Sequence, residues 1–299
     1  MNEQASRCGF AAIVGRPNVG KSTLLNKILG QKISIVTPKP QTTRHRIIGV
    51  HIARQTQILF VDTPGIQIQS RRAIDSVMNR NAQQSIADAD VLLFVTEYGK
   101  WKDGDEHVLN MLRQSNQPVI AVLNKCDTAA SKVALLPHLQ ALSERHDFLA
   151  LFPASAKSGE NLNQLIDYIA DYLPVGPWLF PADAETDKDS KFRCAEIIRE
   201  KLMMELQEEI PYGLTVEIES WEDDSGRVAV AAIIWCEKES QKPIIIGKQG
   251  ERLKRVGTAA RKEVKRMLGL PVHLQLWAKT RRNWADSMQS LRSLGYEST

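Results

Sequence analysis

The sequence predicts an α/β protein in two parts: a doubly wound, mostly parallel sheet, followed by a smaller α+β domain. In residues 9–172, short apolar runs alternate with amphipathic helical patterns, which is typical of a parallel sheet covered by helices on both faces. After a proline-rich segment, the order changes to helix, two strands, helix and strand, and the last helix and strand lie in a basic stretch. The length of 299 residues agrees with two domains, and 43% hydrophobic residues suffice for two cores.

The composition excludes several classes of protein. Charged residues make up 25% of the chain, an ordinary globular share that excludes a disordered chain or a fibrous repeat. The four cysteines show no metal-type CxxC spacing, and a chain of this length needs no disulfides, so we expect a reducing, cytosolic compartment. The first residues lack the layout of a signal peptide, and no apolar run is long enough for a transmembrane helix.

The first part is expected to alternate five strands with five helices. The predicted strands are residues 10–14, 58–61, 91–95, 119–123 and 148–152. The predicted helices are residues 21–29, 70–87, 107–114, 132–143 and 161–172.

A phosphate-binding loop follows the first predicted strand. Residues 15–22 read GRPNVGKS, which matches GxxxxGK[ST] in the strand–loop–helix context that the motif requires. Glycines let backbone N–H groups point at phosphate oxygens, and the helix N-terminus adds positive potential. We expect Lys21 to neutralise the β- and γ-phosphates and the Ser22 hydroxyl to bind Mg²⁺. The predicted nucleotide-binding residues of this loop are Gly15, Arg16, Pro17, Asn18, Val19, Gly20, Lys21, Ser22 and Thr23.

A second phosphate motif, DTPG, ends the strand at 58–61 and comprises Asp62, Thr63, Pro64 and Gly65. By itself this sequence indicates only a turn, but downstream of a phosphate-binding loop it predicts a nucleotide-sensing segment. The Asp62 carboxylate can hold Mg²⁺, commonly through water, and the Gly65 N–H can contact the γ-phosphate.

Two further motifs predict the base site. NKCD (residues 124–127) follows the strand at 119–123, and SAK (residues 155–157) follows the strand at 148–152. A carboxylate at Asp127 can accept two hydrogen bonds from the edge of guanine, which adenine does not offer. Asn124 is expected to fix the surrounding loops, and the stem of Lys125 to cover the base. The predicted base-site residues are Asn124, Lys125, Asp127, Ser155, Ala156 and Lys157.

These four motifs, in this order, resemble the TRAFAC GTPases over residues 9–172. The resemblance implies a GTP-binding fold with two switch loops, the first at residues 37–46, TPKPQTTRHR. Alignment to a TTR pattern makes Thr43 the implied ligand of Mg²⁺ and the γ-phosphate, with Thr42 as the alternative. The implied metal ligands are Ser22, Thr43 and Asp62, and the implied catalytic residues are Lys21, Thr43, Asp62 and Gly65.

One position departs from Ras-like enzymes, in which a glutamine after DxxG orients the attacking water. Here that residue is Ile66, which cannot hydrogen-bond water, and Gln67 and Gln69 are out of register. Hydrolysis must then rely on positioning, on the charge of Mg²⁺ and on another group, and we expect slow turnover. Asn18 resembles the residue that binds K⁺ in cation-dependent relatives, which implies K⁺ as a second cofactor; the alternative role is stabilising the turn.

Three prolines and a glycine within residues 173–184 predict a stiff connector. We therefore assign a GTPase domain to residues 1–173, a linker to residues 174–186 and a second domain to residues 187–299. The net charge of +4 hides a strong asymmetry, because residues 242–282 contain 12 basic and 2 acidic residues. This concentration is the electrostatic signature of a polyanionic partner.

The second domain shows a helix at 194–208, strands at 214–221 and 228–235, a helix at 251–268 and a strand at 272–279. The GKQG sequence before the second helix lets a nucleic-acid backbone approach closely, and together with the basic helix it is typical of a type II KH fold. A GxxG alone would indicate a plain turn. Trp277 and Trp284 could stack on bases, although Trp277 in an alternating strand is better explained as core. The predicted RNA-binding residues are Gly247, Lys248, Gln249, Gly250, Arg252, Lys254, Arg255 and Lys262.

A GTPase joined to a type II KH domain resembles the Era family over nearly the whole chain. The resemblance implies a GTP-hydrolysing switch that binds single-stranded RNA near the 3′ end of small-subunit rRNA and assists assembly of the small ribosomal subunit. It also implies peripheral association with the inner membrane. We further expect a cytoplasmic monomer that binds no DNA. The alternatives are a GTP-dependent membrane adaptor that binds anionic lipid, and, less favoured, a metabolic phosphotransferase.

Overall fold

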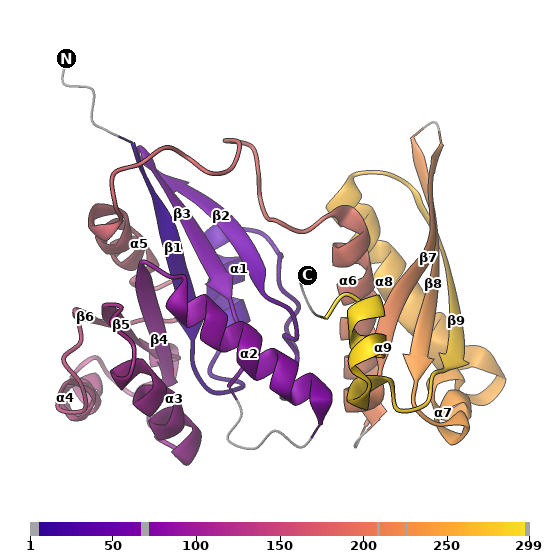
Figure 1. Cartoon of the computed structure of the whole chain (residues 1–299), viewed down its shortest axis with the longest axis horizontal. Coiled ribbons are helices and arrows are strands. Elements are labelled where there is room, and N and C mark those ends of the chain that lie inside the picture. The colour runs from indigo at the N-terminus through magenta and orange to yellow at the C-terminus, as the bar shows by residue number, and fades with distance from the viewer. Residues whose placement is uncertain (1–5, 67–71, 208–209, 225, 297–299) are drawn as a thin grey trace. The chain divides into compact units, whose positions relative to one another are not determined.

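The computed structural model describes residues 6–66, 72–207, 210–224 and 226–296. Contacts between residues divide the chain into two units, one of residues 1–71 and 75–187, the other of residues 72–74 and 188–299. The first unit is a mostly parallel α/β sheet and the second is a small α+β domain, so the predicted fold class is confirmed (Figure 1).

The first unit is built on a six-stranded sheet in the order β2-β3-β1-β4-β5-β6. Only β2 runs antiparallel to its neighbour, and the other pairs are parallel. The five predicted strands are present with slightly different bounds, whereas β2 was not predicted. The strands are β1 (Arg7–Val14), β2 (Ile47–Ala53), β3 (Thr56–Asp62), β4 (Val91–Glu97), β5 (Val119–Asn124) and β6 (Ala150–Pro153).

Helices cover both faces of this sheet and create two cores. The helices are α1 (Lys21–Leu29), α2 (Ala73–Ala87), α3 (Asp103–Arg113), α4 (Leu136–Ser143) and α5 (Leu162–Tyr172). Helices α1 and α5 bury Leu25 and Leu165 against one face. Helices α2 and α3 bury Ala82 and Val108 against the other. Because alternate residues of a strand face opposite sides, these fully apolar strands serve both cores.

The predicted linker packs on the first unit. The side chain of Gln57 in β3 is fully buried and forms three hydrogen bonds with it: Nε2 donates to Phe180 O (2.7 Å), and Oε1 accepts from the N–H groups of Leu179 and Phe180 (both 2.9 Å). Further along, Val50 N donates to Glu185 O at 2.9 Å. Residues 175–187 thus form a strap along the sheet.

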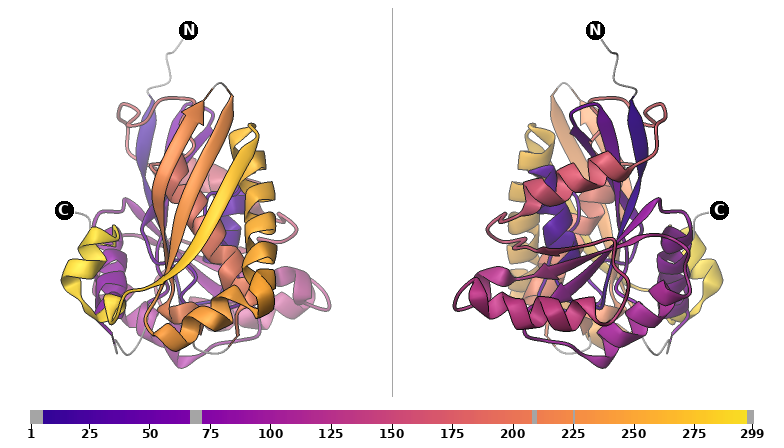
Figure 2. Two further views of the ribbon diagram at one scale, coloured as in Figure 1. Left: turned by 90° about the vertical axis from the view of Figure 1, so that its right-hand side faces the viewer. Right: turned by 90° about the vertical axis from the view of Figure 1, so that its left-hand side faces the viewer.

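The second unit has the order α6 (Ser190–Glu205), β7 (Thr215–Asp224), β8 (Arg227–Cys236), α7 (Lys242–Ile246), α8 (Glu251–Leu268), β9 (Val272–Thr280) and α9 (Met288–Ser293). Strand β8 pairs antiparallel with β7 and parallel with β9, as a type II KH fold requires. The left view of Figure 2 looks onto this sheet, with α6 and α8 behind it. The core between sheet and helices contains Ile198 of α6, Ile234 of β8 and Val256 of α8.

Two predictions about tryptophans were wrong. Trp277 lies on the outer face of β9 and is 41% exposed, whereas Leu274, Leu276 and Ala278 face the helices. Trp284 is fully buried and its Nε1 donates to Gly213 O at 3.1 Å, so its ring is part of the core and does not stack on bases.

All four cysteines are buried free thiols, as expected for a chain without disulfides. Within the part of the chain that the structure describes, no helix is long and apolar enough to cross a membrane. Short 3₁₀ turns complete the secondary structure: η1 (Cys126–Thr128), η2 (Val133–Leu135), η3 (Ile210–Gly213), η4 (Glu239–Gln241), η5 (Lys248–Gly250) and η6 (Trp284–Asp286).

Candidate nucleotide site and nucleic-acid interface

The four predicted nucleotide motifs lie at the carboxyl ends of parallel strands. The phosphate-binding loop follows β1, DTPG begins at the last residue of β3, NKCD begins at the last residue of β5, and SAK follows β6. The chain crosses from one side of β1 to the other between β3 and β4, and such a switch point is where open α/β sheets bind ligands.

Helix α1 starts at Lys21 after Gly20, and no side chain caps its first N–H groups. These groups are therefore available to an anion. The Lys21 side chain is buried, and its Nζ donates to Gly15 O (2.9 Å) and Arg16 O (3.1 Å). Burial lowers the pKa of Lys21 to about 8, against the opposing attraction of Asp62. The loop thus holds a cation that a phosphate group can pair with.

Three side chains that end in oxygen atoms come together beside this loop. Ser22 Oγ lies 2.7 Å from Asp62 Oδ2 and 2.8 Å from Thr43 Oγ1, which is 3.4 Å from the same carboxylate oxygen. Burial raises the pKa of Asp62, and its Oδ1 is buried without a hydrogen-bond partner. Hydroxyl and carboxylate oxygens are ligands that Mg²⁺ prefers, so this set fits the ion. Thr42 Oγ1 instead bonds Thr37 Oγ1 (2.6 Å) and Lys39 O (2.8 Å).

A cavity of about 420 Å³ opens over these residues. Predicted residues that line it are Pro17, Asn18, Gly20, Lys21, Ser22, Thr23, Thr43, Gly65 and Lys125. Gly65 sits so close to the phosphate-binding loop that a Cβ there would come within 2.8 Å of Pro17 Cγ. Thr37, Pro38, Gln41 and Thr42 of the implied switch I also line it, together with Ile35 and Val36, which the sequence reasoning missed.

The base motifs are joined to the phosphate-binding loop by side-chain amides. Asn124 Nδ2 donates to Val19 O (2.8 Å), and Asn124 Oδ1 accepts from Ala156 N (2.9 Å). Asn124 therefore fixes two loops at once, as predicted. Ser155 Oγ donates to Asp127 Oδ1 at 2.6 Å, which orients the exposed carboxylate. Lys157 is exposed.

Two residues bear on hydrolysis. Ile66 is 3% exposed and packs in the core, so it offers nothing to a water molecule; Gln67 and Gln69 lie outside the described residues. Asn18 has a left-handed backbone with φ of 66°, and its Nδ2 donates to Pro38 O at 3.0 Å. Asn18 therefore joins the phosphate-binding loop to the implied switch I.

In the second unit, the GKQG loop connects α7 to α8. Gly247 has φ of 77°, and a Cβ there would lie 2.8 Å from Arg252 Cβ, so only glycine fits. Arg252 donates to Ile244 O and thereby braces the loop. Lys248 and Gln249 at its tip are exposed.

A groove of about 430 Å³ runs from this loop between α8 and β9. Its lining residues are Gly250, Leu253, Lys254, Gly257, Thr258, Arg261, Leu274 and Leu276. Of the predicted RNA-binding residues, Gly250 and Lys254 belong to this wall. Arg255 pairs with Glu205 of α6 at 2.9 Å, and Lys262 is exposed away from the groove wall. Arg261 was not among the predicted RNA-binding residues, although its spacing of seven from Lys254 places both on one helix face.

A phosphate-binding loop, a guanine-type base motif and an αββααβ domain with GxxG define a P-loop GTPase that carries a KH domain. Comparisons with known proteins agree: a family described as "50S ribosome-binding GTPase" matches residues 10–125, and the KH domain family matches residues 209–285. The chain belongs to the Era family of GTPases, and it is an enzyme that hydrolyses GTP.

The family assignment rests on relatives similar over their full length. GTPase Era of Glaesserella parasuis is 48% identical over 99% of both chains, and GTPase Era of Cronobacter sakazakii is 48% identical with the same coverage. Crystal structures of Aquifex aeolicus Era with GDP and AlF4⁻, and of Era with MgGDPNP and nucleotides 1506–1542 of 16S ribosomal RNA, both give a TM-score of 0.93. They are 41% and 40% identical and cover 97% of this chain and 99% of theirs.

Proposed function

We propose that GTP, GDP and Mg²⁺ bind in the 420 Å³ cavity. The observation that carries this proposal is the cluster of Ser22, Thr43 and Asp62 beside the uncapped start of α1. These three residues would hold Mg²⁺, which would neutralise charge on the phosphates. Lys21 pairs with the phosphates, and Asp127 selects guanine. The relative solved with MgGDPNP supports the choice of ion.

Hydrolysis in this proposal proceeds without a water-orienting glutamine, because Ile66 is buried in the core. Electrostatic stabilisation by Lys21, Gly65 and the ion then supplies most of the rate enhancement, and turnover is slow. A K⁺ ion near Asn18 would add positive charge where an arginine finger acts in other GTPases. Equal turnover in matched Na⁺ and K⁺ buffers would count against this part of the proposal.

The second part of the proposal concerns RNA. The KH domain binds single-stranded rRNA near the 3′ end of the small-subunit rRNA, and the protein assists assembly of that subunit. Support comes from the groove, whose mixed wall of Leu253, Leu274, Lys254 and Arg261 suits bases and phosphates together. The 40% identical relative solved with the 16S fragment supports the same choice. RNA-contacting residues would be the GKQG tip, Lys254 and Arg261.

The functional division proposed is a GTPase domain at 1–173, a linker at 174–186 and a KH domain at 187–299. The protein would act as a cytoplasmic monomer, without binding DNA. Peripheral association with the inner membrane would use exposed cations of α8 outside the groove, such as Lys262, Lys265 and Arg266.

The deciding experiment measures binding of a labelled oligonucleotide from the 3′ end of small-subunit rRNA, with a scrambled oligonucleotide as the reference. The test variant is Lys248→Asp with Gln249→Asp. Its control, Lys265→Asp with Arg266→Gln, changes the charge equally but at the other end of α8, away from the GKQG loop. Loss of selective binding in the first variant alone supports the KH site. Equal binding of both RNAs, lowered similarly in both variants, would leave a nonspecific basic surface and favour the membrane adaptor.

A further inference from the structure

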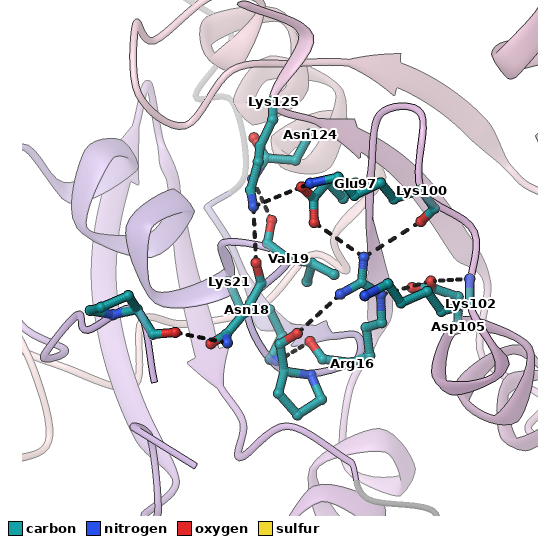
Figure 3. A network of polar contacts seen from close by, with 12 residues as sticks. Arg16, Asn18, Val19, Lys21, Glu97, Lys100, Lys102, Asp105, Asn124 and Lys125 are labelled. Atoms are coloured by element: carbon teal, nitrogen blue, oxygen red, sulfur yellow. Dashed lines mark hydrogen bonds and ion pairs between the residues drawn. The ribbon is translucent and has the colours of Figure 1, made fainter. Parts of the chain in front are cut away.

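A network of charged side chains joins the phosphate-binding loop to the base motif (Figure 3). Glu97, the last residue of β4, lies at its centre. Glu97 Oε2 pairs with an Arg16 guanidinium nitrogen at 3.1 Å, and Glu97 Oε1 pairs with Lys125 Nζ at 3.2 Å and Lys100 Nζ at 2.8 Å. The Glu97 side chain is only 10% exposed, so these pairs form largely away from water. One carboxylate therefore contacts a residue of each nucleotide loop.

Arg16 is held from a second side. Its Nε pairs with Asp105 Oδ2 at 2.8 Å, and the Asp105 side chain is fully buried. The same Asp105 oxygen accepts from Lys102 N (2.9 Å) at the start of α3, so its position is fixed by the helix. Arg16 is thus anchored between β4 and α3, and its planar fork presents a fixed charge to Glu97.

The charge of Glu97 persists at neutral pH. Burial opposes its ionisation, but hydrogen bonds from Lys100, Lys125 and Arg16 outweigh burial and lower the pKa of Glu97 to about 2. A stable carboxylate among three cations is a suitable anchor for a flexible lysine.

Lys125 is the residue that this anchor affects. Its Nζ also donates to Asn18 O at 3.1 Å, and its side chain lines the nucleotide cavity. A lysine stem has several rotatable bonds, and ordering it costs up to about 2 kcal/mol of rotamer freedom. With its Nζ held by Glu97 and Asn18 O, the stem is fixed along the cavity wall.

We propose that Glu97, braced by Arg16, is a positioning residue for guanine recognition: it fixes the Lys125 ammonium so that the lysine stem lies against the face of the base. This inference rests on the proposed guanine site and names a residue outside the four nucleotide motifs. It assigns Arg16 a role through its side chain, whereas the motif uses only the loop backbone at that position.

The test compares dissociation rates of fluorescent GDP from the full chain in four proteins besides the parent: Glu97→Gln, Lys125→Met, the double variant, and Lys100→Ala as the control. Lys100 pairs with the same Glu97 oxygen, but its side chain is 60% exposed. We expect Glu97→Gln to speed release about tenfold, which corresponds to about 1.4 kcal/mol. Lys100→Ala should stay within about twofold.

The double variant separates positioning from general damage. If Glu97 acts through Lys125, then Glu97→Gln adds no further acceleration once Lys125→Met is present. A second readout is the ratio of GDP to IDP release, since IDP lacks the exocyclic amine that Asp127 is expected to bind. Contact with the face of the base does not depend on that amine, so Glu97→Gln should leave the ratio unchanged.

Additive effects in the double variant, or a changed GDP to IDP ratio in Glu97→Gln, would overturn the inference while leaving the guanine site intact. No effect of Lys125→Met on release would instead refute the proposed site itself. The two failures are therefore distinguishable.

Discussion

Nucleotide binding should take up a proton at Lys21. Lys21 is buried, and its pKa is lowered from 10.5 to about 8, mainly by burial. A bound phosphate brings opposite charge to the ammonium and raises that pKa. Binding must then protonate whatever fraction of Lys21 was neutral. That fraction is about 0.25 at pH 7.5 and about 0.75 at pH 8.5, so GDP affinity should fall about threefold between these values.

Calorimetric titration with GDP in buffers of different ionisation enthalpy measures this proton uptake. Phosphate groups ionise near pH 6 and add little in this range. Guanosine is the control, because it fills the base site without a phosphate and should take up no proton at Lys21. Uptake below about 0.1 proton with GDP at pH 8.5, or equal uptake with guanosine, would refute the reasoning. The same pKa shift has a sign for stability. Between about pH 8 and 10.5 the folded chain binds fewer protons than the unfolded chain, so the burial of Lys21 opposes folding less and less as pH rises through this range.

Three further predictions concern single side chains with matched controls. Thr43→Val should weaken Mg²⁺-dependent GTP binding about tenfold or more, whereas Thr42→Val should not. If Mg²⁺ titrations show the same loss of GTP affinity in both variants, Thr43 is not the ligand that distinguishes them. Gln57→Ala should lower the free energy of unfolding in urea by about 2–4 kcal/mol, because three hydrogen bonds to the strap are lost. The control, Gln55→Ala at an exposed site, should change it by less than about 0.5 kcal/mol. Similar losses in both variants would contradict a stabilising role of the Gln57 hydrogen bonds. Trp284→Phe should lower the free energy of unfolding by about 1–3 kcal/mol, because it leaves Gly213 O unpaired. A loss no larger than that of Trp277→Phe, at an exposed site, would argue against a stabilising role of the Trp284 hydrogen bond.

The parallel core of the first unit could be predicted from the sequence because each of its strands is a continuous apolar run. Strand β2 was missed for a physical reason. It joins β3 through a tight turn at residues 54–55, and Arg54 adopts the left-handed conformation with φ of 56°. The usual signal for such a hairpin is Asn-Gly or Asp-Gly, and an arginine there gives none. A scheme of strands alternating with helices also leaves no place for an antiparallel strand.

The alternating pattern of β9 could be recognised in the sequence, but not which set of alternate residues faces the core. Because side chains of a strand alternate between two faces, assigning one residue to the core fixes the face of all the remaining residues. Trp277 is the largest apolar side chain of the strand, yet Leu274, Leu276 and Ala278 are the residues that face the helices. Long-range charge pairs were equally invisible, since Arg16 meets Glu97 and Asp105 only after the strands are assembled. Motifs thus located the candidate site, while its supporting contacts required the fold.

The strap pairs with β2 only where it contains no proline. Pro177 and Pro181 in the strap, and Pro174 just before it, lack the N–H that a central strand needs, which is why the sequence predicted neither strand nor helix. The stretch beyond them has no proline, and there Asp187 N donates to Ile48 O at 3.3 Å while Thr186 bridges Gly49 in antiparallel fashion. Strand β2 is the edge of the sheet, and an unpaired edge invites association with other chains. A few proline-free residues at the end of the strap therefore cover part of the edge that β2 would otherwise expose.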